Sequence, residues 1–216
     1  MRILNGTKVI DAEPGWREAL LHGGRRVVID LGAGDGRFAY ESARNDAASV
    51  YVAVDPDAAA LAAYAFRACR KPARGGVANA HFVVAAVAAL PAPLHALADL
   101  VCVNFPWGGL LRGLLQPETA VLRALASLAK PGGRFQLVLA YDPQRDSGAF
   151  TGEPLPVPDE TYIDPALVPA YGAAGLAVEE RRRLSREEAL AIPSTWGRRL
   201  LHARPRDVFL LRGSVR

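Results

Sequence analysis

The chain has 216 residues, of which 50% are hydrophobic and 22% charged, and its formal net charge is +4. This composition excludes an intrinsically disordered chain, and we expect a single domain over residues 1–216. The longest apolar stretch, residues 82–94, is too short to span a bilayer, and two cysteines cannot build a disulfide framework or a Cys-rich zinc site. We therefore expect a cytoplasmic protein without a membrane or metal site.

Strands and helices alternate along the chain after a small hairpin expected within residues 1–12. The expected strands cover residues 26–31, 50–55, 81–86, 99–104, 134–140, 178–184 and 208–211, and the expected helices cover 36–46, 57–70 and 117–129. Residues 143–170 are expected to form an insert, with a proline-rich loop over 153–169 and a short helix behind it. Because the strands are almost continuously apolar, we expect an α/β fold with a mostly parallel sheet that binds ligands at its carboxyl ends.

A glycine-rich loop follows the first expected strand. Residues 30–36 read Asp-Leu-Gly-Ala-Gly-Asp-Gly, and glycine lets the backbone turn sharply and pass close to a ligand. The second expected strand ends in Asp55, whose carboxylate can accept hydrogen bonds from both hydroxyls of a ribose. NAD is the main alternative ligand, but its fingerprint needs a third glycine where this chain has Arg37.

This loop resembles the S-adenosylmethionine (SAM) site of class I methyltransferases. The resemblance rests on the D-x-G-x-G-x-G pattern and on the acid that ends the second strand. In that family Asp30 would orient the ammonium end of the methionine moiety, and Asp55 would hold the ribose. Gly32 and Gly34 would line the methionine.

The fourth expected strand runs into Asn104-Phe105-Pro106-Trp107-Gly108. This segment is similar to the Asn/Asp-Pro-Pro-aromatic motif of enzymes that methylate amine nitrogens on bases. Proline has no N–H, so nearby carbonyl oxygens are free to accept from an exocyclic amine. An aromatic face stacks on a base with a free energy of about 1–3 kcal/mol. A packing role is the alternative for Trp107.

The C-terminal segment is strongly basic. Residues 181–216 contain ten Arg and three acids, which suggests a polyanionic partner. Trp196 lies beside Arg198 and Arg199, as in a stacking platform next to phosphate contacts. The alternative is a helix-packing tryptophan flanked by solvated arginines.

Over essentially its whole length, the chain resembles the 16S ribosomal RNA (adenine-1408-N1) methyltransferases, which are aminoglycoside-resistance enzymes of the kanamycin–apramycin type. Five segments carry the resemblance: Gly6-Thr7-Lys8, residues 30–37, Lys71-Pro72-Ala73-Arg74-Gly75-Gly76, residues 105–108 with 110–113, and Ser194-Thr195-Trp196-Gly197-Arg198-Arg199-Leu200. The glycine loop is generic, whereas the other segments together are specific.

The resemblance implies a class I, Rossmann-like fold with a seven-stranded, mostly parallel sheet and an N-terminal β-hairpin. It also implies a monomer that uses SAM, releases S-adenosylhomocysteine and acts on the assembled 30S subunit. Trp107 and Trp196 would sandwich the flipped adenine, and the backbone near Pro106 would accept its amino group. Adenine N1 carries a lone pair and no proton at neutral pH, so we expect no catalytic Asp, His or Cys.

The resemblance assigns the remaining contacts as two sets. The cofactor would contact Asp30, Gly32, Gly34, Asp55, Val87, Ala88, Asn104, Ser194 and Trp196. The RNA phosphates would contact Arg70, Lys71, Arg74, Arg198, Arg199, Arg204 and Arg206. The chain departs from the family at Ala88, where an acid often lies near the cofactor adenine, and this departure puts the cofactor affinity in doubt.

Three other functions fit parts of the sequence. The chain could methylate another RNA, such as a transfer RNA, or bind SAM without catalysis. A small-molecule methyltransferase is the third alternative, but it would not need the basic C-terminal segment.

Overall fold

The computed structural model describes residues 1–146, 148, 154–203 and 205–216. In this part of the chain, nine strands form one sheet in the order β2-β1-β5-β4-β3-β6-β7-β9-β8. The strands are β1 (Arg2–Asn5), β2 (Lys8–Asp11), β3 (Arg26–Leu31), β4 (Ser49–Asp55), β5 (Ala80–Val84), β6 (Ala98–Asn104), β7 (Ala129–Leu139), β8 (Leu176–Arg183) and β9 (Phe209–Val215). Strands β3 to β7 pair in parallel, and the strands outside them join antiparallel.

The sheet has nine strands rather than the expected seven because the N-terminal hairpin joins its edge. Ile3 of β1 pairs with Val83 of β5, which places the hairpin beside the third expected strand. The other seven strands correspond to those expected from the sequence. Strand β7 begins earlier than expected, at Ala129, and its pairing with β6 shifts register before Arg134.

The α-helices are α1 (Trp16–Leu21), α2 (Arg37–Asn45), α3 (Ala58–Ala68), α4 (Gly108–Leu115), α5 (Thr119–Leu128), α6 (Pro143–Asp146), α7 (Glu160–Tyr162), α8 (Val168–Ala173), α9 (Arg186–Ala191) and α10 (Thr195–Ala203). A π-helical turn, η6 (Ile163–Leu167), joins α7 to α8, and 3-10 turns include η2 (Pro72–Arg74), η3 (Val87–Ala89) and η4 (Ala92–Leu94).

The loop expected over 153–169 is wrong for its C-terminal half, because residues 160–173 are helical. Asp159 caps this segment by accepting hydrogen bonds from the N–H groups of Thr161 and Tyr162. Ile163, Leu167 and Tyr171 recur every four residues and are buried, so the segment has one apolar face. The burial of this face stabilises the helical segment although it contains Pro165 and Pro169.

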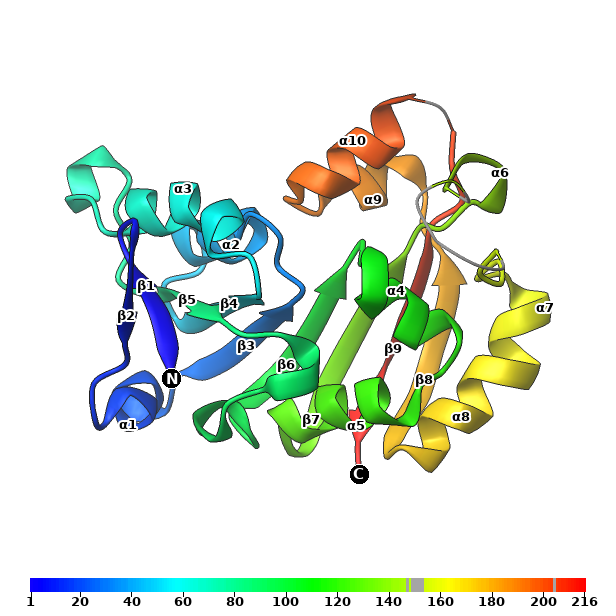
Figure 1. Cartoon of the computed structure of the whole chain (residues 1–216), viewed down its shortest axis with the longest axis horizontal. Coiled ribbons are helices and arrows are strands. Elements are labelled where there is room, and N and C mark those ends of the chain that lie inside the picture. Colours follow the sequence, from blue (N-terminus) through cyan, green and yellow to red (C-terminus); the bar gives the residue numbers. More distant parts are fainter. Residues whose placement is uncertain (147, 149–153, 204) are drawn as a thin grey trace.

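Helices cover both faces of the sheet (Figure 1). Helices α1, α4, α5 and α8 contribute to one core cluster, with strand residues such as Ile29. On the opposite face α2 and α3 pack with Ala53, whereas α9 and α10 pack with Val138 in a separate cluster. Strands β3 and β6 lie between the cluster of α2 and α3 and the cluster of α9 and α10. The strand order reverses at this pair of strands, and such a reversal is the usual ligand crevice of a parallel sheet.

Helices α9 and α10 lie above the carboxyl ends of the central strands (Figure 1). Ser185 starts α9 with a capping box, in which the Ser185 hydroxyl accepts from the Glu188 N–H and the Glu188 carboxylate accepts from the Ser185 N–H. The Arg186 guanidinium donates to the Leu201 carbonyl, which ties α9 to α10. No helix in the described part of the chain is long and apolar enough to cross a membrane.

Candidate active site

A cavity of about 610 Å³ opens at the carboxyl ends of β3, β4 and β6. Its lining combines the glycine-rich loop, the turns after β4, β5 and β6, and the start of α10. The lining residues are 31–35, 54–56, Ala60, 85–87, 104–105, Trp107, 109–110, 194–196 and Arg199. Most of these segments are those that the sequence analysis singled out for the cofactor and the target base.

A buried polar pair adjoins this cavity, which Asn104 lines and Asp30 does not. Asp30 and Asn104 stand on the adjacent strands β3 and β6 and are 3% and 7% exposed. The Asn104 amide Nδ2 donates to Asp30 Oδ1 at 3.2 Å, and Asn104 Oδ1 is buried with no hydrogen-bond partner. Burial raises the pKa of Asp30 from 3.8 to about 7; the hydrogen bond from Asn104 opposes this rise, and the negative charges of Asp55 and Asp35 add to it.

The glycine-rich loop approaches its neighbours closely. Gly32 has a φ of +72°, and a Cβ there would lie 2.5 Å from Leu110 Cδ2, so only glycine fits. The N–H groups of Gly32 and Ala33 both donate to the Val54 carbonyl, which holds the loop against β4. The loop is therefore fixed by backbone contacts and leaves its outer surface to the cavity.

Asp55 ends β4 beside this loop. Its Oδ2 accepts from the Gly34 N–H at 2.8 Å, and its Oδ1 accepts from the Asp57 N–H at 2.9 Å. Burial raises the pKa of Asp55, and these two hydrogen bonds oppose the rise. The contacts aim the carboxylate across the cavity edge, and each oxygen keeps a lone pair for a diol.

Apolar groups line the cavity beyond Asp55, namely Pro56, Ala85 and Val87. Ala88 is exposed and does not line the cavity, although it was expected to contact the cofactor. Ala88 belongs to η3, whose first residue, Val87, lines the cavity. At this end the cavity suits the flat face of a base more than a charged partner.

Two indoles meet at the other end of the cavity. The ring centroids of Trp107 and Trp196 are 5.1 Å apart, and their planes make an angle of 68°. Trp107 precedes α4 and Trp196 belongs to α10, and Trp196 is 36% exposed. A base held between parallel rings needs two stacking gaps of about 3.5 Å each. The rings therefore have to turn and part before a base can enter.

Comparison with known proteins explains this arrangement. The family model described as NpmA, 16S rRNA (adenine(1408)-N(1))-methyltransferase, matches residues 2–215. The chain belongs to this methyltransferase family. An Escherichia coli 16S rRNA (adenine(1408)-N(1))-methyltransferase is 33% identical over 219 residues, with 100% of this chain and 99% of the relative covered. One of the same name from Streptoalloteichus tenebrarius is 37% identical over 191 residues, with coverage of 88% and 87%.

Solved structures agree with this family. A mutant 16S rRNA (adenine(1408)-N(1))-methyltransferase from Catenulisporales acidiphilia, with cosubstrate SAM, superposes with a TM-score of 0.89 at 33% identity, covering 99% of this chain and 96% of that one. The 16S rRNA methyltransferase KamB gives a TM-score of 0.87 at 33% identity, with coverage of 100% and 99%. The class I methyltransferase fold expected from the sequence is confirmed.

The buried pair fits the cofactor of this methyltransferase family. The methionine end of SAM carries an ammonium group, which needs acceptors and a negative charge. Asn104 Oδ1 is an acceptor without a partner, and Asp30 supplies the charge. Both lie where the order of strands reverses. Among the described residues, no group of three or more His, Cys, Asp or Glu side chains could hold a metal ion.

Cations expected to meet RNA lie on two separate surfaces of the methyltransferase. Arg70, Lys71 and Arg74 surround η2 and are exposed, as are Arg198 and Arg199 on α10. No carboxylate among the described residues forms an ion pair with any of the five. Arg199 also lines the cavity beside the indoles, which the sequence analysis did not anticipate.

Much of the basic C-terminal segment is neutralised by ion pairs. The pairs are Arg181–Asp164, Arg182–Glu180, Arg182–Glu188, Arg183–Asp207 and Arg212–Glu180. The charge excess of residues 181–216 therefore overstates the surface open to a polyanion. Arg204, expected to contact phosphate, lies outside the described residues.

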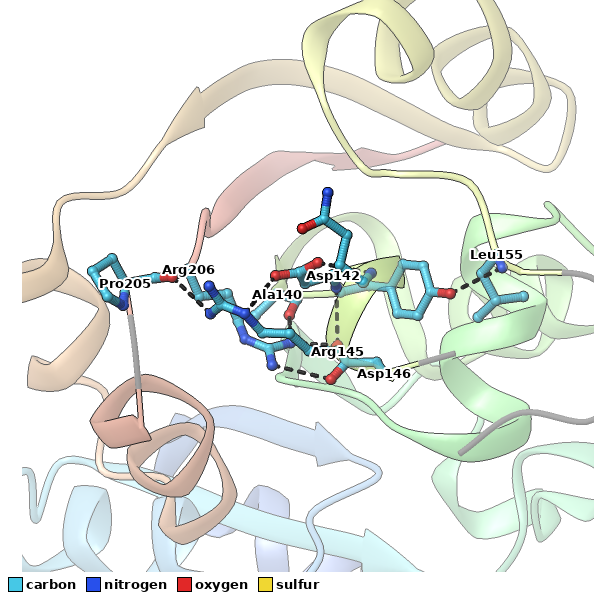
Figure 2. A network of polar contacts seen from close by, with 9 residues as sticks. Ala140, Asp142, Arg145, Asp146, Leu155, Pro205 and Arg206 are labelled. Atoms are coloured by element: carbon cyan, nitrogen blue, oxygen red, sulfur yellow. Dashed lines mark hydrogen bonds and ion pairs between the residues drawn. The ribbon is translucent and has the colours of Figure 1, made fainter. Parts of the chain in front are cut away.

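Arg206 lies in a different environment from that of an open phosphate contact. Its side chain is 6% exposed and pairs with Asp146, which is equally buried (Figure 2). It also donates to the Ala140 carbonyl at 2.6 Å, and its Nε is buried without a partner. As the structure stands, Arg206 holds α6 against the end of β7. A phosphate would have to open this pair.

Proposed function

We propose that this chain methylates N1 of adenine 1408 in 16S rRNA within the assembled 30S subunit, using SAM, and thereby confers aminoglycoside resistance. The observation that carries the proposal is the contact of Trp107 with Trp196 in the cavity that Asn104 also lines, with Asp30 hydrogen-bonded to Asn104. One end of this cavity suits an ammonium group, and the other presents two aromatic faces to a base. Membership of the methyltransferase family supports the same reaction.

In this proposal the cofactor occupies the cavity along β3 and β4. Asp30 and Asn104 hold the ammonium group, and Gly32 and Gly34 line the methionine moiety. Asp55 accepts from the ribose hydroxyls, and Ser194 and Trp196 close the methionine end. Backbone atoms of Val87, which lines the cavity, contact the adenine. When bound, SAM supplies an electrophilic methyl group on a positively charged sulfur.

The reaction needs no base from the protein. The N1 lone pair of the adenine forms a bond to the methyl carbon as the carbon–sulfur bond breaks, and the positive charge passes from sulfur to the base. Trp107 and Trp196 present electron-rich faces that favour this charge. Carbonyl oxygens near Pro106 accept the exocyclic amine and fix the ring orientation. Alignment of this kind can lower a barrier by roughly 7–11 kcal/mol.

The basic surfaces bind the rRNA backbone. Arg70, Lys71 and Arg74 form one contact region, and Arg198 and Arg199 form another on the far side of the cavity. We also assign phosphate contacts to Arg204 and Arg206, and Arg206 has to leave its pair with Asp146 to make one. Extraction of the adenine costs a few kcal/mol, which the two stacking faces offset. We propose that the protein acts as a monomer in the cytoplasm, where 30S subunits assemble.

Primer extension tests the proposal. Purified protein and SAM are incubated with 30S subunits, free 16S rRNA and transfer RNA, and the small-subunit RNA is then reverse-transcribed. We expect a stop one nucleotide before adenine 1408 when the substrate is the 30S subunit, and no such stop when it is free 16S rRNA. Expression should raise the minimum inhibitory concentrations of kanamycin and apramycin but not of gentamicin. Methylation of transfer RNA instead, or SAM binding without any transfer, would contradict the proposal.

A further inference from the structure

Phe105 has an unusual backbone and an unusual neighbour. It follows β6 with a φ of +53°, a left-handed conformation that side chains other than glycine rarely adopt, and it is 3% exposed. A Cβ placed on Gly197 would lie 2.5 Å from Phe105 Cε2 and 2.6 Å from Cδ2. The ring thus occupies the space that any side chain at position 197 would need.

This contact joins the two segments that carry the indoles. Phe105 lies two residues before Trp107, and Gly197 directly follows Trp196. The Phe105 N–H donates to the Val138 carbonyl at 2.9 Å, so its backbone is tied to β7. On the other segment, the Gly197 N–H donates to Ser194 Oγ at 3.0 Å at the start of α10. Each indole therefore lies within two residues of one partner in a close packing contact.

We propose that Phe105 and Gly197 are positioning residues that set the separation of the Trp107 and Trp196 rings. The inference rests on the proposed function, because it concerns how the base receives two stacking faces. The left-handed backbone turns the Phe105 ring toward α10, into a cluster with Leu201 and Leu210. The missing side chain at position 197 lets α10 approach this ring. A larger residue there lifts α10 and moves Trp196 away from Trp107.

A set of variants tests this inference. Gly197→Ala introduces the clash, Phe105→Leu shortens the ring, and the double variant combines the two. Gly172→Ala is the matched control, because Gly172 also lies in a helix and a Cβ there meets nothing within 4 Å. The first readout is the exciton couplet of the two indoles in circular dichroism, which weakens as the rings separate. The second readout is kcat and KM for methylation of 30S subunits.

We expect Gly197→Ala to weaken the couplet and to lower kcat at least tenfold with little change in KM, while Gly172→Ala matches the unmodified protein. Phe105→Leu should restore part of both signals in the double variant, because it opens space for the new methyl group. Should Gly197→Ala fail to fold, Phe105→Leu alone still tests the inference, since a shorter side chain loosens α10 and weakens the couplet.

The two readouts separate the inference from the proposed function. An unchanged couplet in Gly197→Ala and in Phe105→Leu overturns the inference, as does a vanished couplet with normal turnover. Absence of rescue in the double variant also overturns it. If the couplet responds and is rescued while the unmodified protein methylates no 30S subunits, the packing role stands and the proposed function fails.

Discussion

Asn104 donates one hydrogen bond to Asp30 and keeps its own carbonyl oxygen buried without a partner. A buried carboxylate and a buried acceptor lie side by side next to the cavity, and no cation among the described residues forms an ion pair with Asp30. A site of this kind costs stability in the empty protein and gains affinity for a ligand that completes it. The structure thus links the ammonium-binding end of the cavity to measurable effects of pH and of substitution.

Asp30→Asn should reduce the affinity for SAM on the order of 10- to 100-fold, which corresponds to the roughly 1.5–3 kcal/mol of a hydrogen bond to a charged group. Because the pKa of Asp30 is raised to about 7, the unmodified protein should bind SAM more tightly as the pH rises through neutrality. Calorimetric titration measures both effects. Equal affinities for the two proteins would remove Asp30 from the ammonium site.

The same substitution should change how stability depends on pH in the absence of SAM. Between about pH 4 and pH 7 the folded chain keeps the Asp30 proton that the unfolded chain has released, so the stability of the unmodified protein falls as pH rises. Asp30→Asn removes this contribution. The stability of the variant relative to that of the unmodified protein should therefore be higher at about pH 8 than at about pH 5. Urea unfolding at both values provides the comparison. A difference of the opposite sign would show that other groups in the folded chain stabilise the charged Asp30 carboxylate.

Trp107→Ala and Trp196→Ala should each nearly abolish methylation of 30S subunits, because each removes a stacking face that contributes about 1–3 kcal/mol and orients the base. SAM binding should remain measurable in both variants. Trp16→Phe is a suitable control, since Trp16 contacts His81 outside the cavity. Normal turnover in both alanine variants would exclude a sandwich of the adenine.

Arg199→Glu and Lys71→Glu should weaken binding to 30S subunits and reduce the slope of affinity against salt by about one unit for each phosphate that the protein no longer neutralises. Arg134→Gln should have no such effect, because Arg134 is already paired with Glu179. Filter binding at several salt concentrations distinguishes the two Glu variants from the Arg134→Gln control. An unchanged slope in both Glu variants would mean that these cations only solubilise the protein.

Asp146→Asn should lower the free energy of unfolding by roughly 3–5 kcal/mol, because it leaves the buried Arg206 guanidinium without its counter-charge. Asp164→Asn breaks an exposed pair with Arg181 and should cost about 0–1 kcal/mol. Chemical denaturation of both variants gives the two values. Similar values would show that the Arg206 pair opens readily, as phosphate binding by Arg206 requires.

The elements that sequence predicts best are those whose pattern is local. Strands β3 and β4 are short runs of β-branched residues, and their predicted bounds agree with the structure to within one residue. Helix α4 escaped prediction because it begins with Gly108 and Gly109, which disfavour helices. For residues 160–173, the sequence predicted only a short helix behind a loop, because Pro165 and Pro169 mask a buried stripe.

The site shows a similar division. The glycine loop and Asp55 follow from spacing, and the two tryptophans follow from a family resemblance. Charge counting in the C-terminal segment overstated the open positive surface because several of its arginines pair with acids outside the segment. Asp164 pairs with Arg181 and Asp146 pairs with Arg206, and no local pattern marks either pair. The contact of Phe105 with Gly197 likewise exists only once α10 packs on β6.

Nucleoside mass spectrometry of 16S rRNA tests the central claim most directly. After treatment of 30S subunits with the protein and SAM, the rRNA is digested and its methylated nucleosides are quantified. A lone-pair attack by a base held between two indoles predicts a gain of 1-methyladenosine that approaches one per rRNA molecule. A gain of N6-methyladenosine or of a methylated guanosine, without 1-methyladenosine, would contradict the account.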